Sequence, residues 1–191
     1  MEKIKALLYC TKNGKKLVDT SKYDFDFSNQ KISCYTLNGK IVAECDFEVE
    51  EIECRTSIGI NGIHDEYTTK SLGENELLYA SKIDDITFIN YLKGKNGYAI
   101  HIKNLKERVM ELSDVYTYDN SYNNMFGWLA EENEKYIPLA KAPQNMCRVW
   151  IYENGKWVMY ILISVRPEWL CLELYGEKTI EVRKRVLKGM L

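Results

Sequence analysis

Residues 163–185 read ISVRPEWLCLELYGEKTIEVRKR and predict a strand, a short helix and a second strand in close succession. Pro167 suits the first position of a helix, because its missing N–H is not needed there. Gly176 suits the position just past the last turn, where the backbone often turns left-handed. The residues between them predict a two-turn helix, and the chain then continues into the strand KTIEVRK.

The second strand carries the polar residues of this stretch. Lys178 lies at the junction of helix and strand, and Thr179, Glu181 and Arg183 alternate onto one strand face. A lysine, a carboxylate and an arginine along one edge can bind a phosphate or a polar base edge, or carry out acid–base chemistry. The alternative is an exposed, salt-bridged strand. Because exposed charges contribute little to stability, replacing Lys178 and Arg183 is expected to leave the fold intact.

The segment GEKTIEVR (176–183) resembles the GxKxxExR signature of ASCH domains, small modules of the PUA-like superfamily. Four further segments resemble parts of bacterial and phage ASCH proteins: LLYCTK (7–12), LNGKIVAECDF (37–47), YLKGKNGYAIHIKNL (91–105) and KAPQNMC (141–147). The resemblance implies one α+β domain over 1–191, a mostly antiparallel PUA-like β-barrel with two or three short helices. It leaves 13–36, 56–85 and 113–140 as variable loops.

The order of these segments differs from that of the family, in which the signature precedes the YCTK-like strand. Here the signature lies near the C-terminus and LLYCTK opens the chain, as in a circular permutant, which tolerates termini placed in an exposed loop. The strands Leu7–Thr11 and Thr179–Arg183 are then expected in one barrel, with Met1 near Leu191. Strand exchange between two copies, giving a swapped homodimer rather than a monomer, is the alternative.

The resemblance implies binding of RNA or a modified nucleotide in a basic cleft beside Lys178, Glu181 and Arg183. A smaller branch of the family resembles amidohydrolases that deacylate acetylated cytidine with a lysine and a nearby threonine. Lys178 matches that lysine, but Glu181 occupies the threonine position, so an enzyme would depend on Lys178 and Glu181. A third reading is a phage or mobile-element protein that binds another protein through the aromatic segment 116–128, an irregular loop or helix on which bases could also stack.

Single residues elsewhere complete the predicted ligand site. Arg166 before Pro167 can meet a phosphate, Trp169 can stack on a base, and an amide at Gln144 can accept or donate at a base edge. Lys12, at the end of LLYCTK, adds a positive charge. His101, in the middle of the strand GYAIHIKNL, faces either the cleft or a structural partner.

Alternation and turn signals predict the remaining elements. Strands are expected at 4–11, at 41–49 and at 97–105, where apolar and polar residues alternate. Asp84–Asp85 predict a helix that ends near Leu92, and Asn154-Gly155 predicts a hairpin between 147–152 and 157–165. Residues 56–75, rich in Ser, Gly, Asn and Thr, are expected to form a loop.

Composition sets the class of protein. The chain has 191 residues, 46% of them hydrophobic, and a formal net charge of −2. Residues 3–22 carry six lysines and one aspartate, residues 177–188 five basic and two acidic residues, and residues 44–54 six acidic residues and no basic one. If the two ends meet, a basic face for a polyanion results; otherwise these runs are solvated faces.

Without an apolar run or export signal, the sequence favours a cytoplasmic protein with reduced thiols. The absence of CxxC pairs and the presence of only two histidines predict no metal, and no cofactor is expected.

Overall fold

The computed structural model describes residues 3–12, 14, 25–27, 30–32, 37–118 and 135–191. Its strands are β1 (Ile4–Cys10), β2 (Phe25–Phe27), β3 (Gln30–Ile32), β4 (Lys40–Gly59), β5 (Gly62–Thr68), β6 (Gly97–Glu111), β7 (Tyr116–Tyr118), β8 (Tyr136–Pro138), β9 (Met146–Glu153), β10 (Lys156–Val165) and β11 (Ile180–Arg183). Its helices are α1 (Glu74–Ser81), α2 (Asp85–Leu92) and α4 (Pro167–Leu174), with a 3-10 turn η2 (Leu112–Asp114). Strands therefore dominate the described part of the chain.

Nine strands form one open mixed sheet, so the expected closed barrel is wrong. The strand order is β11-β6-β4-β1-β10-β9-β7-β8, with β5 paired to β4 alone, while β2 and β3 pair separately. β1 runs parallel to β10, whereas β9 and β10 are antiparallel. A closed barrel needs its two end strands to pair in a consistent register. Here the end strands β11 and β8 have four and three residues and lie at opposite ends of the strand order.

The two strands near the termini, expected in one barrel, lie in one sheet that is not closed. In the sheet, β1 is separated from β11 by β4 and β6. Met1 lies outside the described residues, so the expected proximity of Met1 and Leu191 stays a prediction, as does the permuted order itself.

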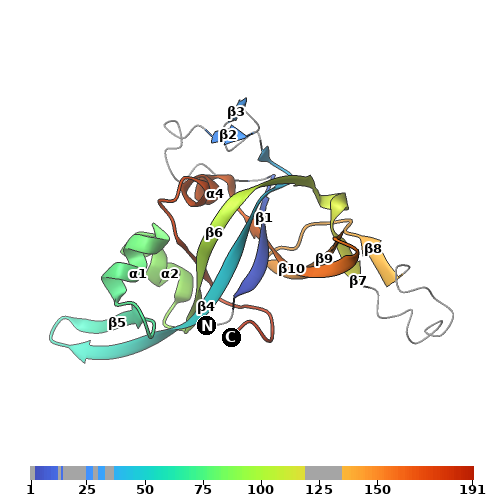
Figure 1. The fold of residues 1–191 in the computed structure, drawn as a ribbon. Helices are drawn as coiled ribbons and strands as arrows, with labels where there is room; N and C mark the ends of the chain where they lie inside the picture. The colour runs from blue at the N-terminus through green and yellow to red at the C-terminus, as the bar shows by residue number, and fades with distance from the viewer. Residues whose placement is uncertain (1–2, 13, 15–24, 28–29, 33–36, 119–134) are drawn as a thin grey trace. The chain divides into compact units, whose positions relative to one another are not determined.

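The chain divides into two compact units. The first comprises 1–4, 46–104 and 172–191, and the second comprises 5–45 and 105–171. In the first unit, α1 and α2 lie side by side next to the β4–β5 hairpin (Figure 1). Its core joins both helices to β4, β5, β6 and β11 through Ile52, Tyr67, Leu77, Phe88, Leu92, Ala99, Ile180 and Val182. This core holds β11, and with it the signature residues, in place.

The second unit contains β7–β10, β1 from Lys5 onward and α4 as far as Cys171, together with the N-terminal part of β4 and the C-terminal part of β6. Its core is Leu7, Tyr9, Ile41, Val115, Val149, Ile151, Tyr160 and Leu162. Cys10, Cys45 and Cys147 in this unit are not disulfide-bonded, and neither is Cys54 in the other. Cys171 forms a disulfide, which differs from the expectation of reduced thiols.

Several predicted elements are confirmed. α2 begins after Asp84, whose carboxylate accepts a hydrogen bond from the Thr87 N–H at 2.9 Å. The β9–β10 hairpin turns at Asn154 and Gly155, both with positive φ, as a two-residue turn requires. The expected loop at 56–75 is wrong, because β4 continues to Gly59, pairs with β5 and is followed by α1.

Candidate functional site

The signature segment lies in the first unit, at the end of α4 and on β11. Gly176 has φ +80° and ends the helix, and the N–H groups of Glu177 and Lys178 both donate to the carbonyl of Leu172. β11 then pairs antiparallel with β6, with Ile180 opposite His101. Helix, turn and strand thus follow each other as the sequence predicts.

Lys178 is a buried cation. Its side chain is 1% exposed, and its ammonium group donates to the carbonyl oxygens of Ser81 (2.6 Å) and Ile180 (2.8 Å). The third neighbour is the Glu181 carboxylate, 3.3 Å away. A lysine has three N–H donors, so these acceptors satisfy all of them. Lys178 therefore ties the end of α1 to β11, and the expectation that it is an exposed charge of little structural value is wrong.

Glu181 lies between two cations. Its second partner is Arg183, 2.8 Å away, and both side chains are largely buried. Burial alone would raise the pKa of Glu181, but Lys178 and Arg183 outweigh it and lower the pKa to about 2. Glu173, on α4, is 3% exposed, and burial together with the Glu181 charge raises the pKa of Glu173 well above its ordinary value. Burial and the Glu181 charge therefore favour the protonated form of Glu173, whereas Lys178 and Arg183 favour the ionised form of Glu181.

This cluster of Lys178, Glu173, Glu181 and Arg183, here called the buried charge cluster, is suited to holding elements together. A hydrolase of the expected kind needs a nucleophile and a base within reach of one acyl carbon. Lys178 is shielded from solvent and held by a carboxylate and two carbonyls. Thr179, the neighbouring hydroxyl-bearing residue, is exposed, and its backbone pairs with Ala80 and Ile102.

His101 has a structural partner. Its Nε2 lies 2.7 Å from the Glu50 carboxylate, which also accepts hydrogen bonds from the hydroxyls of Ser71 (2.6 Å) and Thr69 (3.1 Å). Burial would raise the pKa of Glu50, yet these hydrogen bonds together lower it. Of the two readings given by the sequence, the structure favours the structural histidine.

The other predicted ligand residues lie in the second unit. Lys12, Gln144 and Arg166 are exposed, and Trp169 is half-buried on α4. The carbonyl of Arg166 accepts the N–H groups of Trp169 and Leu170 at the start of α4. The structure thus places Lys178, Thr179, Glu181, Arg183 and His101 in one unit, and Lys12, Gln144, Arg166 and Trp169 in the other.

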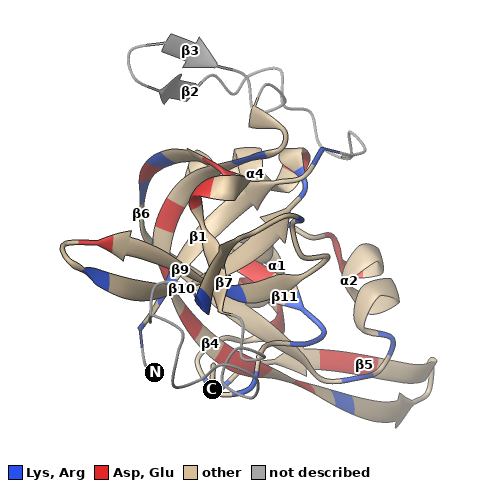
Figure 2. Ribbon diagram, turned by 90° about the vertical axis from the view of Figure 1, so that its right-hand side faces the viewer, with Lys and Arg blue, Asp and Glu red and all other residues tan. Residues whose placement is uncertain are grey.

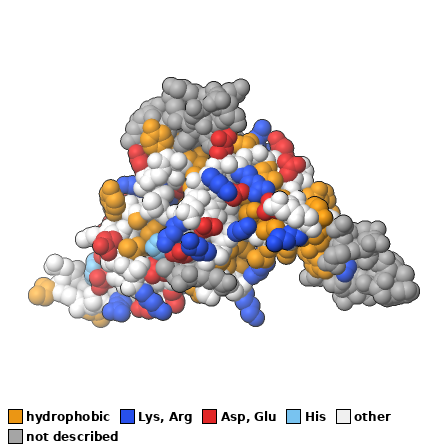
Figure 3. Space-filling model, in the orientation of Figure 1, with side chains coloured by type: hydrophobic (Ala, Val, Ile, Leu, Met, Phe, Trp, Pro, Cys, Tyr) orange, Lys and Arg blue, Asp and Glu red, His pale blue; other side chains and the backbone are white. Residues whose placement is uncertain are grey.

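The acidic residues of β4 are paired with β6. In the first unit, Asp46 accepts from Asn104 (2.7 Å), and Glu48 forms an ion pair with Lys103. In the second unit, Glu44 lies 2.7 Å from both Lys106 and Arg108. Acidic residues recur along β4 in Figure 2, and basic and acidic atoms are interspersed on the face seen in Figure 3. Glu44 and Glu48 thus face cations of β6, whereas the partner of Asp46 is a neutral amide.

Asn104 explains how β6 keeps its polar residues on the side of β4 that carries the carboxylates. In a regular strand, odd and even positions point to opposite faces. His101 and Lys103 are odd positions, whereas the polar residues that follow are the even positions 104, 106 and 108. Asn104, where the change occurs, has φ +52°. A single left-handed residue, which asparagine tolerates better than most, shifts the alternation by one.

An aromatic surface covers one side of the second unit. In the β9–β10 hairpin, Trp157 is opposite Tyr152 and Met159 is opposite Trp150, whereas Val158 and Tyr160 face the core with Ile151 and Val149. β7 adds Tyr116, which pairs with Trp150, and the pair Tyr118–Tyr136 extends it onto β8. We call Tyr116, Tyr118, Tyr136, Trp150, Tyr152 and Trp157 the aromatic face.

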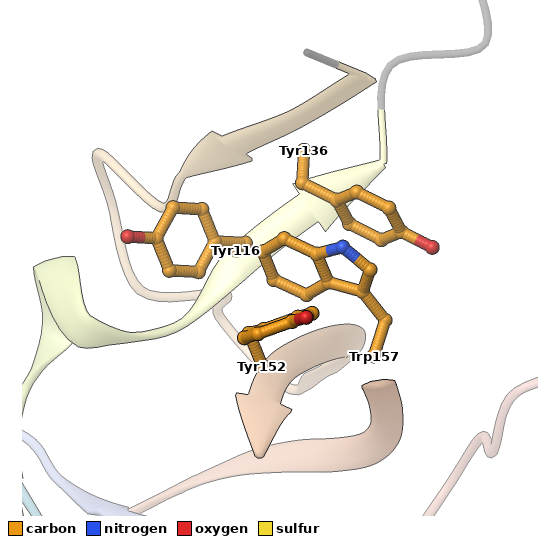
Figure 4. A pocket seen from close by; sticks show the side chains of 4 residues that line it. All are labelled: Tyr116, Tyr136, Tyr152 and Trp157. Atoms are coloured by element: carbon orange, nitrogen blue, oxygen red, sulfur yellow. The ribbon is translucent and has the colours of Figure 1, made fainter. Parts of the chain in front are cut away.

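The rings of this face are in mutual contact and enclose a pocket. Tyr136 stacks on Trp157 with centroids 3.8 Å apart and planes 11° apart. Tyr116 and Tyr152 meet Trp157 edge to face at 5.1 and 5.3 Å. These four residues line a pocket of about 400 Å³, with Trp157 between the tyrosines (Figure 4). Tyr152 is 54% exposed, so ring surface remains open to a ligand.

The sequence contains the signal for this site, although the prediction of an aromatic segment at 116–128 covers only part of it. The predicted Asn154-Gly155 hairpin sets Trp150 and Tyr152 on the same face as Trp157, opposite the apolar residues of the core. Of the predicted segment, 116–118 belongs to the face, while 119–128 lies outside the described residues.

The chain matches no family model, no curated protein and no solved structure. The ASCH resemblance therefore stays a prediction. None of the helices in the described part of the chain is long and apolar enough to cross a membrane.

Proposed function

We propose that this protein binds RNA or a nucleotide by stacking bases on the aromatic face. The observation that carries the proposal is the Tyr136–Trp157 stack, flanked by Tyr116 and Tyr152 around one open pocket. Every nucleobase has a flat face, and aromatic side chains bind bases by stacking with little dependence on sequence. This keeps the ligand class expected from the ASCH resemblance and moves the binding surface away from the signature.

Charge around the face fits a ligand with few phosphates. Arg148 is exposed on the same strand face, two residues before Trp150, and Lys156 is exposed next to Trp157. Each phosphate contact adds about 0.7 to the salt slope for a single strand. Stacking is therefore the main source of affinity in this proposal, and phosphate contacts are secondary. The proposal includes the cytoplasmic location expected from the sequence.

Fluorescence anisotropy with a labelled ten-nucleotide oligo(U) tests the proposal. Trp157→Ala is expected to weaken binding by about 1–3 kcal/mol, the usual loss for one stacked base. Tyr79→Ala is the matched control, because Tyr79 is 75% exposed on α1 of the first unit, whereas the aromatic face belongs to the second unit. Equal binding by the wild type and Trp157→Ala would remove the aromatic face as the site. Absence of binding by the wild type to RNA, single-stranded DNA and mononucleotides alike would reject the function.

A protein partner is the second candidate for the same face. Tyr and Trp are enriched among residues that dominate protein interfaces, and exposed Met159 extends the apolar surface. A fluorescence titration separates the two. An oligonucleotide that quenches the tryptophan fluorescence of the wild type more than that of Trp157→Ala supports the first function, and a lack of any such difference favours the second.

A further inference from the structure

The aromatic face contains rings beyond those that line its pocket. Tyr118 and Trp150 are half-buried, and their ring centroids lie 6.0 Å apart, yet neither residue lines the pocket. Tyr136 joins them to the pocket, because its centroid is 5.1 Å from that of Tyr118 and 6.1 Å from that of Trp150. The pocket residues and the Tyr118–Trp150 pair therefore form two adjacent ring groups on one face of the sheet.

The spacing of the two ring groups follows from β9. Trp150 and Tyr152 point to the same face of this strand and are two residues apart, which corresponds to about 6.8 Å in an antiparallel sheet. On β10, Trp157 is opposite Tyr152, and Met159, opposite Trp150, is 42% exposed. Neighbouring bases of a stacked strand are only about 3.4 Å apart. Two successive bases that rest on the two ring groups are therefore not stacked on each other.

We propose that the aromatic face binds two successive bases of an unstacked, uridine-rich single strand, one base on each ring group. The proposal rests on the proposed function and narrows its ligand from any nucleotide to this class of strand. A duplex presents the edges of its bases in the grooves and keeps their faces covered, so it does not fit. Single-stranded bases can be splayed out and stacked on aromatic side chains.

The preference for uridine follows from the cost of unstacking. Adenine stacks strongly on its neighbours in a strand, whereas uracil stacks weakly. An adenine strand must therefore lose its own base–base contacts before two of its bases can occupy ring groups about 6.8 Å apart. Preferences for pyrimidine runs among single-strand binders arise from stacking strength and backbone flexibility in this way.

The length of the ligand tests the two base positions. NMR chemical-shift titration at one salt concentration gives the affinity of the wild type for UMP and for the dinucleotide pUpU. The dinucleotide is expected to bind at least about fivefold more tightly, the lower end of what one stacked base contributes. A smaller gain would overturn the second position and leave the proposed function intact. Absence of binding to UMP, pUpU and oligo(U) alike would reject the function itself.

Two substitutions of Trp150 separate a stacking ring from an apolar filler. Trp150→Leu keeps an apolar side chain without a flat face, and it is expected to reduce the gain of pUpU over UMP to twofold or less. Trp150→Phe keeps a ring and is the matched control, with a gain of threefold or more. Circular dichroism checks that both variants are folded. An undiminished gain in Trp150→Leu would overturn the assignment of the second base to this ring group.

The identity of the base tests the cost of unstacking. Ten-nucleotide oligo(U) is expected to bind at least threefold more tightly than oligo(A) of the same length. AMP should bind at least as tightly as UMP, because a mononucleotide has no neighbours to lose. Equal binding of oligo(A) and oligo(U), or of a duplex and oligo(U), would overturn the proposal. A preference for UMP over AMP as large as that between the oligonucleotides would overturn unstacking as its cause.

Discussion

The buried charge cluster and the aromatic face both consist of residues that can bind ligands, but the first is buried and the second is partly exposed. Lys178, Glu181 and Arg183 carry formal charges but are shielded from water, and each faces a partner from the protein. The aromatic face consists of side chains that usually fill cores, yet it leaves Tyr152 more than half exposed around a pocket. The charged residues of the signature, which resemble a binding motif, thus have a structural role. The aromatic residues, which are typical of a core, remain accessible to a ligand.

The difference shows that residue type alone does not identify a binding surface. A charge that already faces its full set of partners has little to offer a ligand, and an uncovered ring has a free face. For this protein, the partners present in the fold are a better guide than the chemistry of the motif. The predictions below test the two regions against each other.

The largest effect is expected for Lys178→Met, which removes the cation but keeps the length of the side chain. It removes one of the two cations beside the Glu181 carboxylate and leaves the Ser81 carbonyl without this partner. Breaking a buried pair by removing one partner costs about 3–5 kcal/mol. Urea denaturation measures the loss, with Lys70→Met, at an exposed position of the same unit, as the control. A loss below 1 kcal/mol would contradict the structural role of Lys178.

The acid pair is expected to give the next largest effect, as a pH dependence of stability. The pKa of Glu173 is raised in the folded protein, so its contribution is complete below its unfolded pKa near 4.5 and is lost as pH rises through the folded value. The pKa of Glu181 is lowered to about 2, so its contribution is present above 4.5 and is lost as pH falls toward 2. Glu173→Gln supplies a neutral amide in place of the protonated carboxyl.

The unfolding free energy of Glu173→Gln is therefore expected to decline less than that of the wild type as pH rises above 4.5. The acid-side decline below 4.5 should remain, because Glu181 is still present. Urea denaturation between pH 3 and pH 9 measures both slopes. Glu177→Gln, an exposed glutamate on the same segment, serves as the control. Parallel curves for wild type and Glu173→Gln would show that Glu173 ionises normally.

The aromatic face is expected to respond weakly to salt. Arg148→Ala should reduce the slope of log Kd against log salt for oligo(U) by about 0.7, the value for one phosphate contact to a single strand. Lys70→Ala, in the other unit, should leave the slope unchanged. A total slope near 4 or above would instead point to a broad basic surface and against stacking as the main contribution.

The smallest effect is expected for Lys106→Ala. Lys106 also pairs with a glutamate, Glu44, but its side chain is 70% exposed and Arg108 holds the same carboxylate. Exposed pairs contribute about 0.2–1 kcal/mol. Comparison of its unfolding free energy with that of Lys178→Met shows how strongly burial increases the contribution of an ion pair to stability. A loss as large as that of Lys178→Met would contradict the comparison.

Local elements were predictable where one residue type has a specific backbone role. Asp84 caps α2, Gly176 ends α4, and Asn154-Gly155 turns the β9–β10 hairpin. The hairpin at 56–68 was missed because its outer part is exposed on both faces, so no apolar alternation marks it. Its strands follow from backbone pairing, which leaves no such pattern in the sequence.

The sequence alone determined the elements around the signature and the alternation that separates the aromatic face from the core. Both depend on neighbours within a few residues, for which helix and strand periods are sufficient. The open sheet and the burial of Lys178 depend on distant parts of the chain. Ser81, whose carbonyl accepts from Lys178, lies 97 residues before it, and only the packing of α1 brings the two together. Whether a charged residue faces a ligand or the protein is therefore a property of tertiary structure, because burial and partners are set by residues that no local pattern reports.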